Sequence, residues 1–484
     1  MQILSILKGT SWIARINQLV SDYKFWIAAL CVNYVLLDFV RRLFRGEQKL
    51  LVLLDISILA IFLLFFYKRK IKLERTLRLS IFQFLLTLYI GIVIIQVANF
   101  KTPDLVTTLA GLRAYLLPIP FIWVGYYVAR EEKHSTLEKL AKVLLSLAVI
   151  SIGFGCYMFF ADTSAFAGIA LSMLSPMGHG AHSFGDSTQE LTSSFFASSS
   201  RFSTFLLISY LLIWGVWKWY GKSVLLLFTL FLIGFWVSGS RTGFSIFMFF
   251  NIISVFFFHK RAVFLFMCIG IFASSFYYLI DSDYFGNVVG KASTLDGGGL
   301  SARIHYMFDD LGQYTKRVEQ ALPLSRMKLE NSELLLGIGL GKYGQEALLS
   351  PSVASEVHKW HQQFFEEKYQ YPSEDSGFVK VVIELGLIGA LVFFLFFGAV
   401  TILSLKVIVG SSKYNNYLTF AIGWFPVFWL ALFIKGHPIL SDIFVSSFLY
   451  MSIGFILADT HHQHGRRLLR SEQINCQHND VSSP

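Results

Sequence analysis

The chain has 484 residues, of which 55% are hydrophobic and only 15% are charged, and its mean hydropathy is +0.57. A soluble domain carries about a quarter charged residues, so this composition excludes an ordinary soluble enzyme and predicts an integral membrane protein. The net charge of +10 does not indicate nucleic-acid binding, because the Lys and Arg residues form short clusters between apolar runs instead of one basic patch.

A bilayer core requires about 20 apolar residues per helix. We therefore expect an all-α, polytopic protein with about twelve transmembrane spans, at 25–40, 50–67, 79–100, 110–128, 140–160, 202–219, 223–238, 242–258, 262–280, 384–405, 416–434 and 439–458. Spans one to nine belong to a first membrane domain, 1–280, and spans ten to twelve to a second membrane segment, 376–460. A long polar segment, 281–375, separates them, and 461–484 form a polar tail.

The short connections between the spans indicate an orientation. With the N-terminus in the cytoplasm, 22 Lys and Arg residues of these connections and of the termini lie on the cytoplasmic side and nine on the outer side. This excess predicts that both termini are cytoplasmic and that the 281–375 loop is extracytoplasmic. The basic residues at 41, 42, 45 and 49 fall on the outer side in this arrangement, so the topology of the first two spans stays open.

Two arginines at the ends of spans are candidate functional residues, because an ionisable group at membrane depth is costly and marks a functional path. Arg201 opens span six, and Arg241 occupies a tight turn, Ser-Gly-Ser-Arg-Thr-Gly, at 238–243. The small residues of this turn leave backbone N–H groups open to an anion, directly before a helix N-terminus. Snorkelling to lipid headgroups is the alternative for each arginine taken alone.

Two further arginines lie near the same predicted outer level. Arg113 enters span four, and Arg303 follows a triple glycine early in the long loop. Four guanidinium groups that converge on one site would suit a diphosphate, because the planar fork of arginine matches phosphate oxygens better than the point charge of lysine.

The long loop carries a glycine-rich turn and a pair of carboxylates. The turn, Gly-Ile-Gly-Leu-Gly at 337–341, overlaps a GxGxxG match, but no βαβ unit surrounds it, so a dinucleotide site is excluded. Glu374 and Asp375 directly precede the return to the membrane at 384–389, Glu-Leu-Gly-Leu-Ile-Gly, where a carboxylate would be within reach of the arginines. N-capping of the returning helix by Asp375 or Ser376 is the structural alternative. The histidines show no zincin pattern, so we expect no metal site.

Together these motifs resemble the bacterial O-antigen ligase and O-antigen (exopolysaccharide) polymerase superfamily. The 238–243 turn is similar to the arginine turn of that family, and Arg201 to the arginine that opens an earlier span. The large-loop landmarks follow in the family order at Ser301-Ala-Arg303, 337–341 and 384–389. The resemblance covers roughly 200–400 and is general elsewhere. Ligases of the family place a histidine and an asparagine shortly before the returning Glu-x-Gly, whereas this chain has Asp375-Ser376 there, which favours a polymerase.

The resemblance implies a metal-independent glycosyltransferase without a cofactor, in the bacterial inner membrane. It would join undecaprenyl-diphosphate-linked oligosaccharide units to a glycan acceptor at the outer face. The catalytic residues would be Arg201 and Arg241, which stabilise the leaving diphosphate, and Asp375, the general base; the substrate-binding residues would be Arg303, Arg113 and Glu374. Two alternatives stay open: a ligase that transfers the glycan to lipid or protein, and a lipid-oligosaccharide flippase or transporter.

Overall fold

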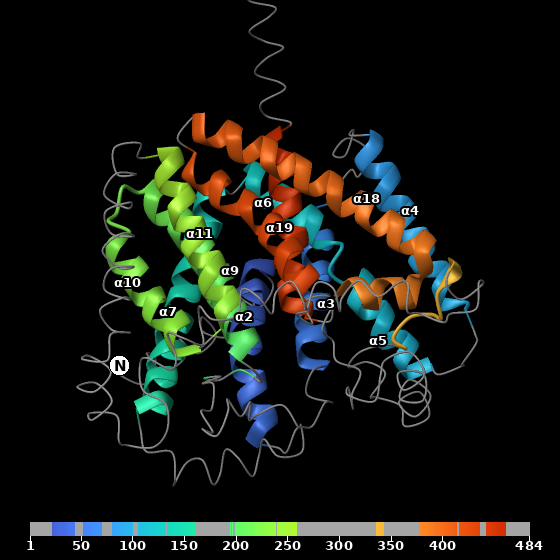
Figure 1. The fold of residues 1–484 in the computed structure, drawn as a ribbon, viewed down its shortest axis with the longest axis horizontal. Coiled ribbons are helices and arrows are strands. Elements are labelled where there is room, and N and C mark those ends of the chain that lie inside the picture. The colour runs from blue at the N-terminus through green and yellow to red at the C-terminus, as the bar shows by residue number, and fades with distance from the viewer. Residues whose placement is uncertain are drawn as a thin grey trace, which may run out of the picture. The chain divides into compact units, whose positions relative to one another are not determined.

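A computed structural model describes a defined set of residues: 22–43, 52–69, 80–99, 105–131, 133–160, 194, 196, 199–238, 240–258, 335–342, 377–413, 416–435 and 442–460. The secondary structure of these residues is helical, with no strand among them (Figure 1). The expected all-α fold class is confirmed for this part of the chain.

The helices overlap the predicted spans, apart from 262–280, which lies outside the described residues. Their bounds are α2 Tyr23–Leu43, α3 Val52–Arg69, α4 Ser80–Val97, α5 Leu105–Leu116, α6 Phe121–Glu131, α7 Lys133–Phe160, α9 Ser199–Trp219, α10 Leu225–Ser238, α11 Arg241–Phe258, α18 Gly377–Lys413 and α19 Tyr417–Lys435, followed by a helix at Ile443–Thr460.

Five apolar stretches among the described residues are long and hydrophobic enough to cross a membrane: Leu105–Arg130, Thr136–Tyr157, Ser200–Trp219, Lys380–Ser412 and Ile443–Thr460. In the remaining apolar helices, the stretch that qualifies is shorter, at 10–17 residues, as at Lys24–Leu37 in α2 and Tyr417–Phe433 in α19. The chain is therefore compatible with a multi-pass membrane protein, whereas the number of twelve spans and the placement of the 281–375 loop stay predictions.

Two of the predicted spans are interrupted. Span four is split into α5 and α6 by a turn at 117–120 that contains Pro118 and Pro120, because proline lacks the N–H that a continuous helix requires. Span ten begins at Gly377, seven residues earlier than predicted, and its helix is broken at Gly386, where φ is 71° and ψ is 178°.

The chain divides into two compact units, and the first predicted membrane domain contributes helices to both. Unit 1 comprises 1–71 and 138–317, and unit 2 comprises 72–137 and 318–484. In unit 1, α2 packs on α3, while α9, α10 and α11 pack on one another. Tyr210 lies at the centre of these three helices, with its ring 5.2 Å from that of Phe231 and 4.7 Å from that of Phe247, and its hydroxyl donates to Oδ1 of Asn251.

In unit 2, α18 packs on α19 and on α4 (Figure 1). Aromatic rings fill the first of these contacts: Phe397 of α18 stacks on Trp429 of α19 at 4.7 Å, and the ring of Phe393 lies 5.3 Å from that of Phe433. Helix α6 approaches the Ile443–Thr460 helix so closely that a Cβ built on Gly125 would lie 1.9 Å from the carbonyl oxygen of Met451. Such small-residue contacts are typical of helix pairs in membranes.

Candidate functional site

The N-terminal turns of α9 and α11 lie together in unit 1. The Oγ atom of Ser203, in the first turns of α9, lies 2.9 Å from Oγ of Ser240, which directly precedes α11. A Cβ built on Gly243 would lie 2.8 Å from the side chain of Ser203, so glycine at this place permits the approach. Residues of the predicted Gly/Ser turn therefore hold the starts of the two helices against each other.

Arg201 and Arg241 belong to these two helix starts. Arg201 is the third residue of α9 and is half-buried, and Arg241 is the first residue of α11. The backbone thus brings both arginines to adjoining helix N-termini, where the helix macrodipole favours negative charge. The side chain of Arg241 lies outside the described part of the structure, so a ligand shared by the two arginines stays a prediction.

The Gly/Ser turn satisfies part of its own hydrogen-bonding groups. The N–H of Ser240 donates to Oγ of Ser238 at 3.3 Å, and the N–H of Gly243 donates to Oγ of Ser240 at 3.4 Å. Ser240 is therefore the N-cap of α11. The expectation that the turn leaves its N–H groups open does not hold for Ser240 and Gly243, because each of these N–H groups already has a serine hydroxyl as acceptor.

In unit 2, the glycine-rich turn at 337–341 docks into the break of α18. The carbonyls of Ile383 and Glu384 precede the break and have lost the partners that a continuous helix would supply. Two consecutive N–H groups of the turn donate to them, at 2.9 Å and 3.2 Å respectively. Two landmarks that are far apart in the sequence thus form one backbone assembly.

Helices α4 and α5 close around the same turn. A Cβ built on Gly341, where φ is +69°, would lie 1.8 Å from the carbonyl oxygen of Thr107, so only glycine fits between the turn and α5. At the end of α4, Nε2 of Gln96 donates to the carbonyl of Leu336, and Nδ2 of Asn99 donates to the carbonyl of Gly337 at 3.1 Å. The carbonyls of Leu336 and Gly337 therefore have donors, as the N–H groups of Ile338 and Gly339 have acceptors.

Buried ionisable side chains surround this turn. Glu384 is 0% exposed, Lys342 is 3% exposed and Lys380, one helical turn before Glu384, is 6% exposed. The hydroxyl of Tyr115, on α5, donates to Oε2 of Glu384 at 2.8 Å. Burial of a charge costs free energy unless the charge is paired, so this cluster marks a place where the sequence keeps charge for a reason other than stability alone.

The structure places the remaining predicted site residues as follows. Arg113 is half-buried and lies in the last turn of α5, not at the entrance of a span, because the helix begins at Leu105. Arg113 belongs to unit 2 and Arg201 to unit 1, so the expected convergence of the arginines stays a prediction. The other three predicted residues, Arg303, Glu374 and Asp375, lie outside the described residues.

The sequence interpretation missed the functional interest of Lys342, Lys380 and Tyr115, and used Glu384 only as a landmark of the resemblance. One signal was present: Lys380 and Glu384 are charges four residues apart at the start of a long apolar helix, and charges at membrane depth are rare. No sequence pattern indicated that Tyr115 lies beside Glu384. Among the described residues, no group of three or more His, Cys, Asp or Glu side chains is placed to hold a metal ion.

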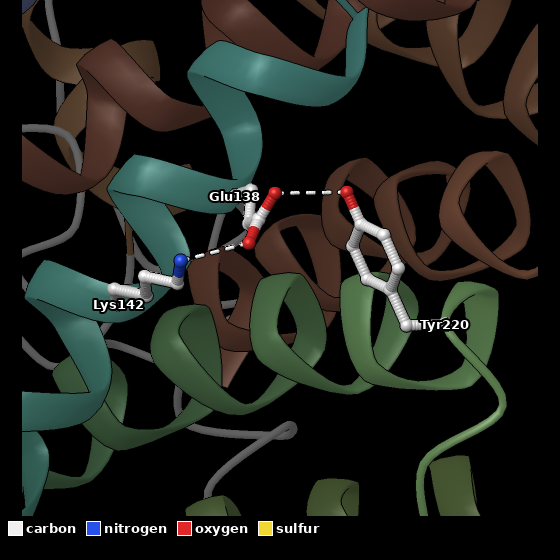
Figure 2. Close-up of polar contacts among 3 residues, drawn as sticks. All are labelled: Glu138, Lys142 and Tyr220. Atoms are coloured by element: carbon white, nitrogen blue, oxygen red, sulfur yellow. Dashed lines mark hydrogen bonds and ion pairs between the residues drawn. The ribbon is translucent and has the colours of Figure 1, made fainter.

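An exposed polar cluster joins α7 to the end of α9 in unit 1. Figure 2 shows Glu138 between Lys142 of its own helix and Tyr220, which directly follows α9. Glu138 forms an ion pair of 2.8 Å with Lys142 and accepts a hydrogen bond of 2.8 Å from the Tyr220 hydroxyl. The neighbouring carboxylate raises the pKa of the Tyr220 phenol. An exposed ion pair contributes little to stability, so what this cluster provides is the link that Glu138 makes between α7 and the residue that follows α9.

Comparison with protein-family models, with curated proteins and with solved structures finds no match to this chain.

Proposed function

We propose that this chain is a polysaccharide polymerase-like glycosyltransferase of the bacterial inner membrane. It joins undecaprenyl-diphosphate-linked oligosaccharide units at the outer face of the membrane, and it does so without a metal. The partners are a lipid-diphosphate-linked donor, a glycan acceptor and the membrane lipid.

The observation that carries this proposal is the contact between the starts of α9 and α11. The 2.9 Å approach of Ser203 to Ser240 holds two helix N-termini together, and each of the two helix starts includes one of the predicted arginines. Two positive dipole ends lie in one region, and the backbone of each helix start carries an arginine, which is a composition that suits a doubly charged phosphate group. This supports an anion site at the place where the sequence interpretation expected one.

The chemistry requires stabilisation of a leaving group and removal of a proton. An acceptor hydroxyl attacks the anomeric carbon of the donor, the bond from that carbon to the diphosphate oxygen breaks, and the lipid diphosphate leaves with the electron pair. Arg201 and Arg241 stabilise the negative charge that develops on the diphosphate. Asp375 takes the proton of the acceptor hydroxyl, and Arg303, Arg113 and Glu374 orient the donor or the acceptor.

A transporter of lipid-linked oligosaccharides is the second candidate, and the break in α18 favours it. Discontinuous helices with freed carbonyls are typical of substrate and ion sites in transporters. In this chain, however, the turn at 337–341 satisfies the carbonyls of Ile383 and Glu384. A ligase, in contrast, would differ from a polymerase only in its acceptor.

The length distribution of glycans on the lipid carrier tests the proposal in cells that lack the protein. We expect single repeat units to accumulate on the outer face of the membrane, because polymerisation is blocked after translocation. Accumulation of long chains on the carrier would show a ligase instead. Repeat units that stay on the cytoplasmic face would show a transporter.

A further inference from the structure

The contact between the segment 336–342, which contains the turn, and the break of α18 at 383–386 forms one backbone assembly, which we call the glycine joint. Backbone groups in an apolar surrounding must find partners within the protein. The joint meets this demand with two hydrogen bonds from the turn to α18 and with one from each of Gln96 and Asn99 to the turn. A Cβ built on Gly386 would lie 2.3 Å from the carbonyl oxygen of Leu335, so the two backbone segments leave no room for a side chain at this position.

Helix α5 contacts the glycine joint at two places along its axis. Near its N-terminal end, Thr107 and Gly111 lie against Gly341. In its last turn, the Tyr115 hydroxyl donates to Glu384. Thr107, Gly111 and Tyr115 are spaced by four residues, and all three are buried. They therefore lie along one face of the helix, and contacts at both ends of that face set the rotation and the axial position of α5.

The same helix carries Arg113, two residues before Tyr115. Arg113 and Tyr115 share the last turn of α5, so the position of α5 determines where the backbone of Arg113 lies. Lys342 directly follows Gly341 and is buried, and a Cβ built on Gly339 would lie 3.3 Å from its Nζ atom. The glycine joint thus fixes the backbone position of two basic residues, Arg113 on α5 and Lys342 at the end of the turn.

We propose that Glu384 is a positioning residue for the donor site, which acts through the Tyr115 hydroxyl to hold Arg113 in place. This inference rests on the proposed function. An ionised carboxylate accepts a hydrogen bond roughly twice as strong as a neutral acceptor does, so Glu384 in its ionised form anchors α5 more firmly than an amide would. The need to position Arg113 explains why the chain keeps a fully buried carboxylate in an apolar helix.

The test is the binding of undecaprenyl diphosphate to the purified full-length protein in lipid nanodiscs. Tyr115→Phe removes one hydroxyl and retains the ring. Tyr220→Phe is the matched control, because it also removes a tyrosine hydroxyl that donates to a glutamate, in the exposed cluster of unit 1 that the proposed function does not use. We expect Tyr115→Phe to weaken binding roughly 5- to 150-fold, the usual range for coupling between sites, and Tyr220→Phe to bind as the wild type does.

A double-mutant cycle separates positioning from general destabilisation. In the Arg113→Lys background, Tyr115→Phe should cause little further loss, because the group that it positions has already been replaced. Independent losses that multiply would overturn the inference. Should Tyr115→Phe reduce the yield of folded protein, Glu384→Gln serves the same cycle, since its amide oxygen still accepts from Tyr115 but carries no charge.

The wild-type measurement distinguishes the two levels of the proposal. If the wild type binds undecaprenyl diphosphate and Tyr115→Phe binds equally well, the inference about Glu384 is wrong and the proposed function stands. If the wild type does not bind undecaprenyl diphosphate, the proposed function fails, and the inference fails with it.

Discussion

Arg201 and Arg241 allow charge and geometry to be tested separately. Exchange of either for lysine retains the charge and removes the bidentate fork. We expect Arg201→Lys and Arg241→Lys each to lower polymer formation by about 10²–10³, the cost of removing one donor to a developing oxyanion, while the amount of protein in the membrane is unchanged. Polymer yield and membrane abundance are measured together in cells that express each variant.

Arg130→Lys is the control for this pair, because Arg130 is exposed in the last turn of α6 and belongs to the predicted cytoplasmic cluster. It should retain wild-type activity. Wild-type yield from both Arg201→Lys and Arg241→Lys would reduce these residues to headgroup anchors.

Asp375 has two possible roles, and Asn distinguishes them. Asn and Asp are about equally good N-caps, so Asp375→Asn leaves a capping role intact. A general base, in contrast, loses about 10²–10⁴ in turnover. We expect the larger loss, measured as turnover of the purified protein, with donor binding unchanged because the arginines remain.

Asp442 provides a matched control for that exchange. Its Oδ1 accepts from the N–H groups of Phe444 and Val445, both at 3.2 Å, at the start of the Ile443–Thr460 helix. Asp442→Asn should therefore retain activity. If Asp375→Asn retains more than about half of the wild-type turnover, Asp375 is not the base, and Glu374 is the next residue to test by its reach to the acceptor hydroxyl.

At the scale of elements, the glycine joint depends on backbone segments that lie too close together for a side chain to fit between them. Gly341→Ala would place a Cβ 1.8 Å from the carbonyl oxygen of Thr107 at a positive φ of +69°. The left-handed conformation alone costs about 1–2 kcal/mol for alanine, and the clash adds to it, so we expect a clear loss of thermal stability. Gly398→Ala is the control, because its Cβ meets nothing within 4 Å and alanine favours the helix by about 1 kcal/mol. Equal melting temperatures for the two variants would contradict the described contact.

The positions of most helices follow from the hydrophobic pattern, because each apolar run of suitable length has one helical solution in a membrane. The two breaks show where this reasoning ends. The prolines at 118 and 120 were visible in the sequence and explain the division of span four. The break at Gly386 was not visible, because a glycine in an apolar run fits a continuous helix equally well. The structure shows that Gly386 has a φ of 71° and that the turn at 337–341 docks against this break.

The candidate site was predictable to a similar extent. The local pattern Ser-Gly-Ser-Arg-Thr-Gly indicated a turn before α11, and Ser240 does cap that helix. The partner of that turn, Ser203, was not predictable, because the contact joins residues 37 apart through tertiary packing. The same holds for Tyr115 and Glu384, which are 269 residues apart.

At the scale of the whole molecule, contacts within each unit agree with the predicted sidedness of the connections. The connections at 130–142 and 218–222 are both predicted to be cytoplasmic, and Glu138 contacts Tyr220 (Figure 2). The outer end of predicted span four (110–128) and the turn at 337–341 are assigned to the same side, and they contact each other through Gly111 and Gly341. Pairs assigned to one side thus meet, although the side itself stays a prediction.

Single cysteines test that side directly. We expect a membrane-impermeant thiol reagent to label Ser325→Cys in intact cells and to label Ser471→Cys only after the membrane is permeabilised. The reason is the excess of Lys and Arg in the connections assigned to the cytoplasm. The opposite labelling pattern would invert the topology and place the proposed site on the cytoplasmic face.

The central claim is glycosyl transfer between lipid-linked units, and one measurement tests it most directly. Purified protein in nanodiscs is supplied with undecaprenyl-diphosphate-linked repeat units in the presence of a metal chelator, and the chain length of the lipid-linked product is measured. The account predicts products longer than one repeat unit, with release of undecaprenyl diphosphate. Unchanged single units in the presence of folded wild-type protein would contradict it.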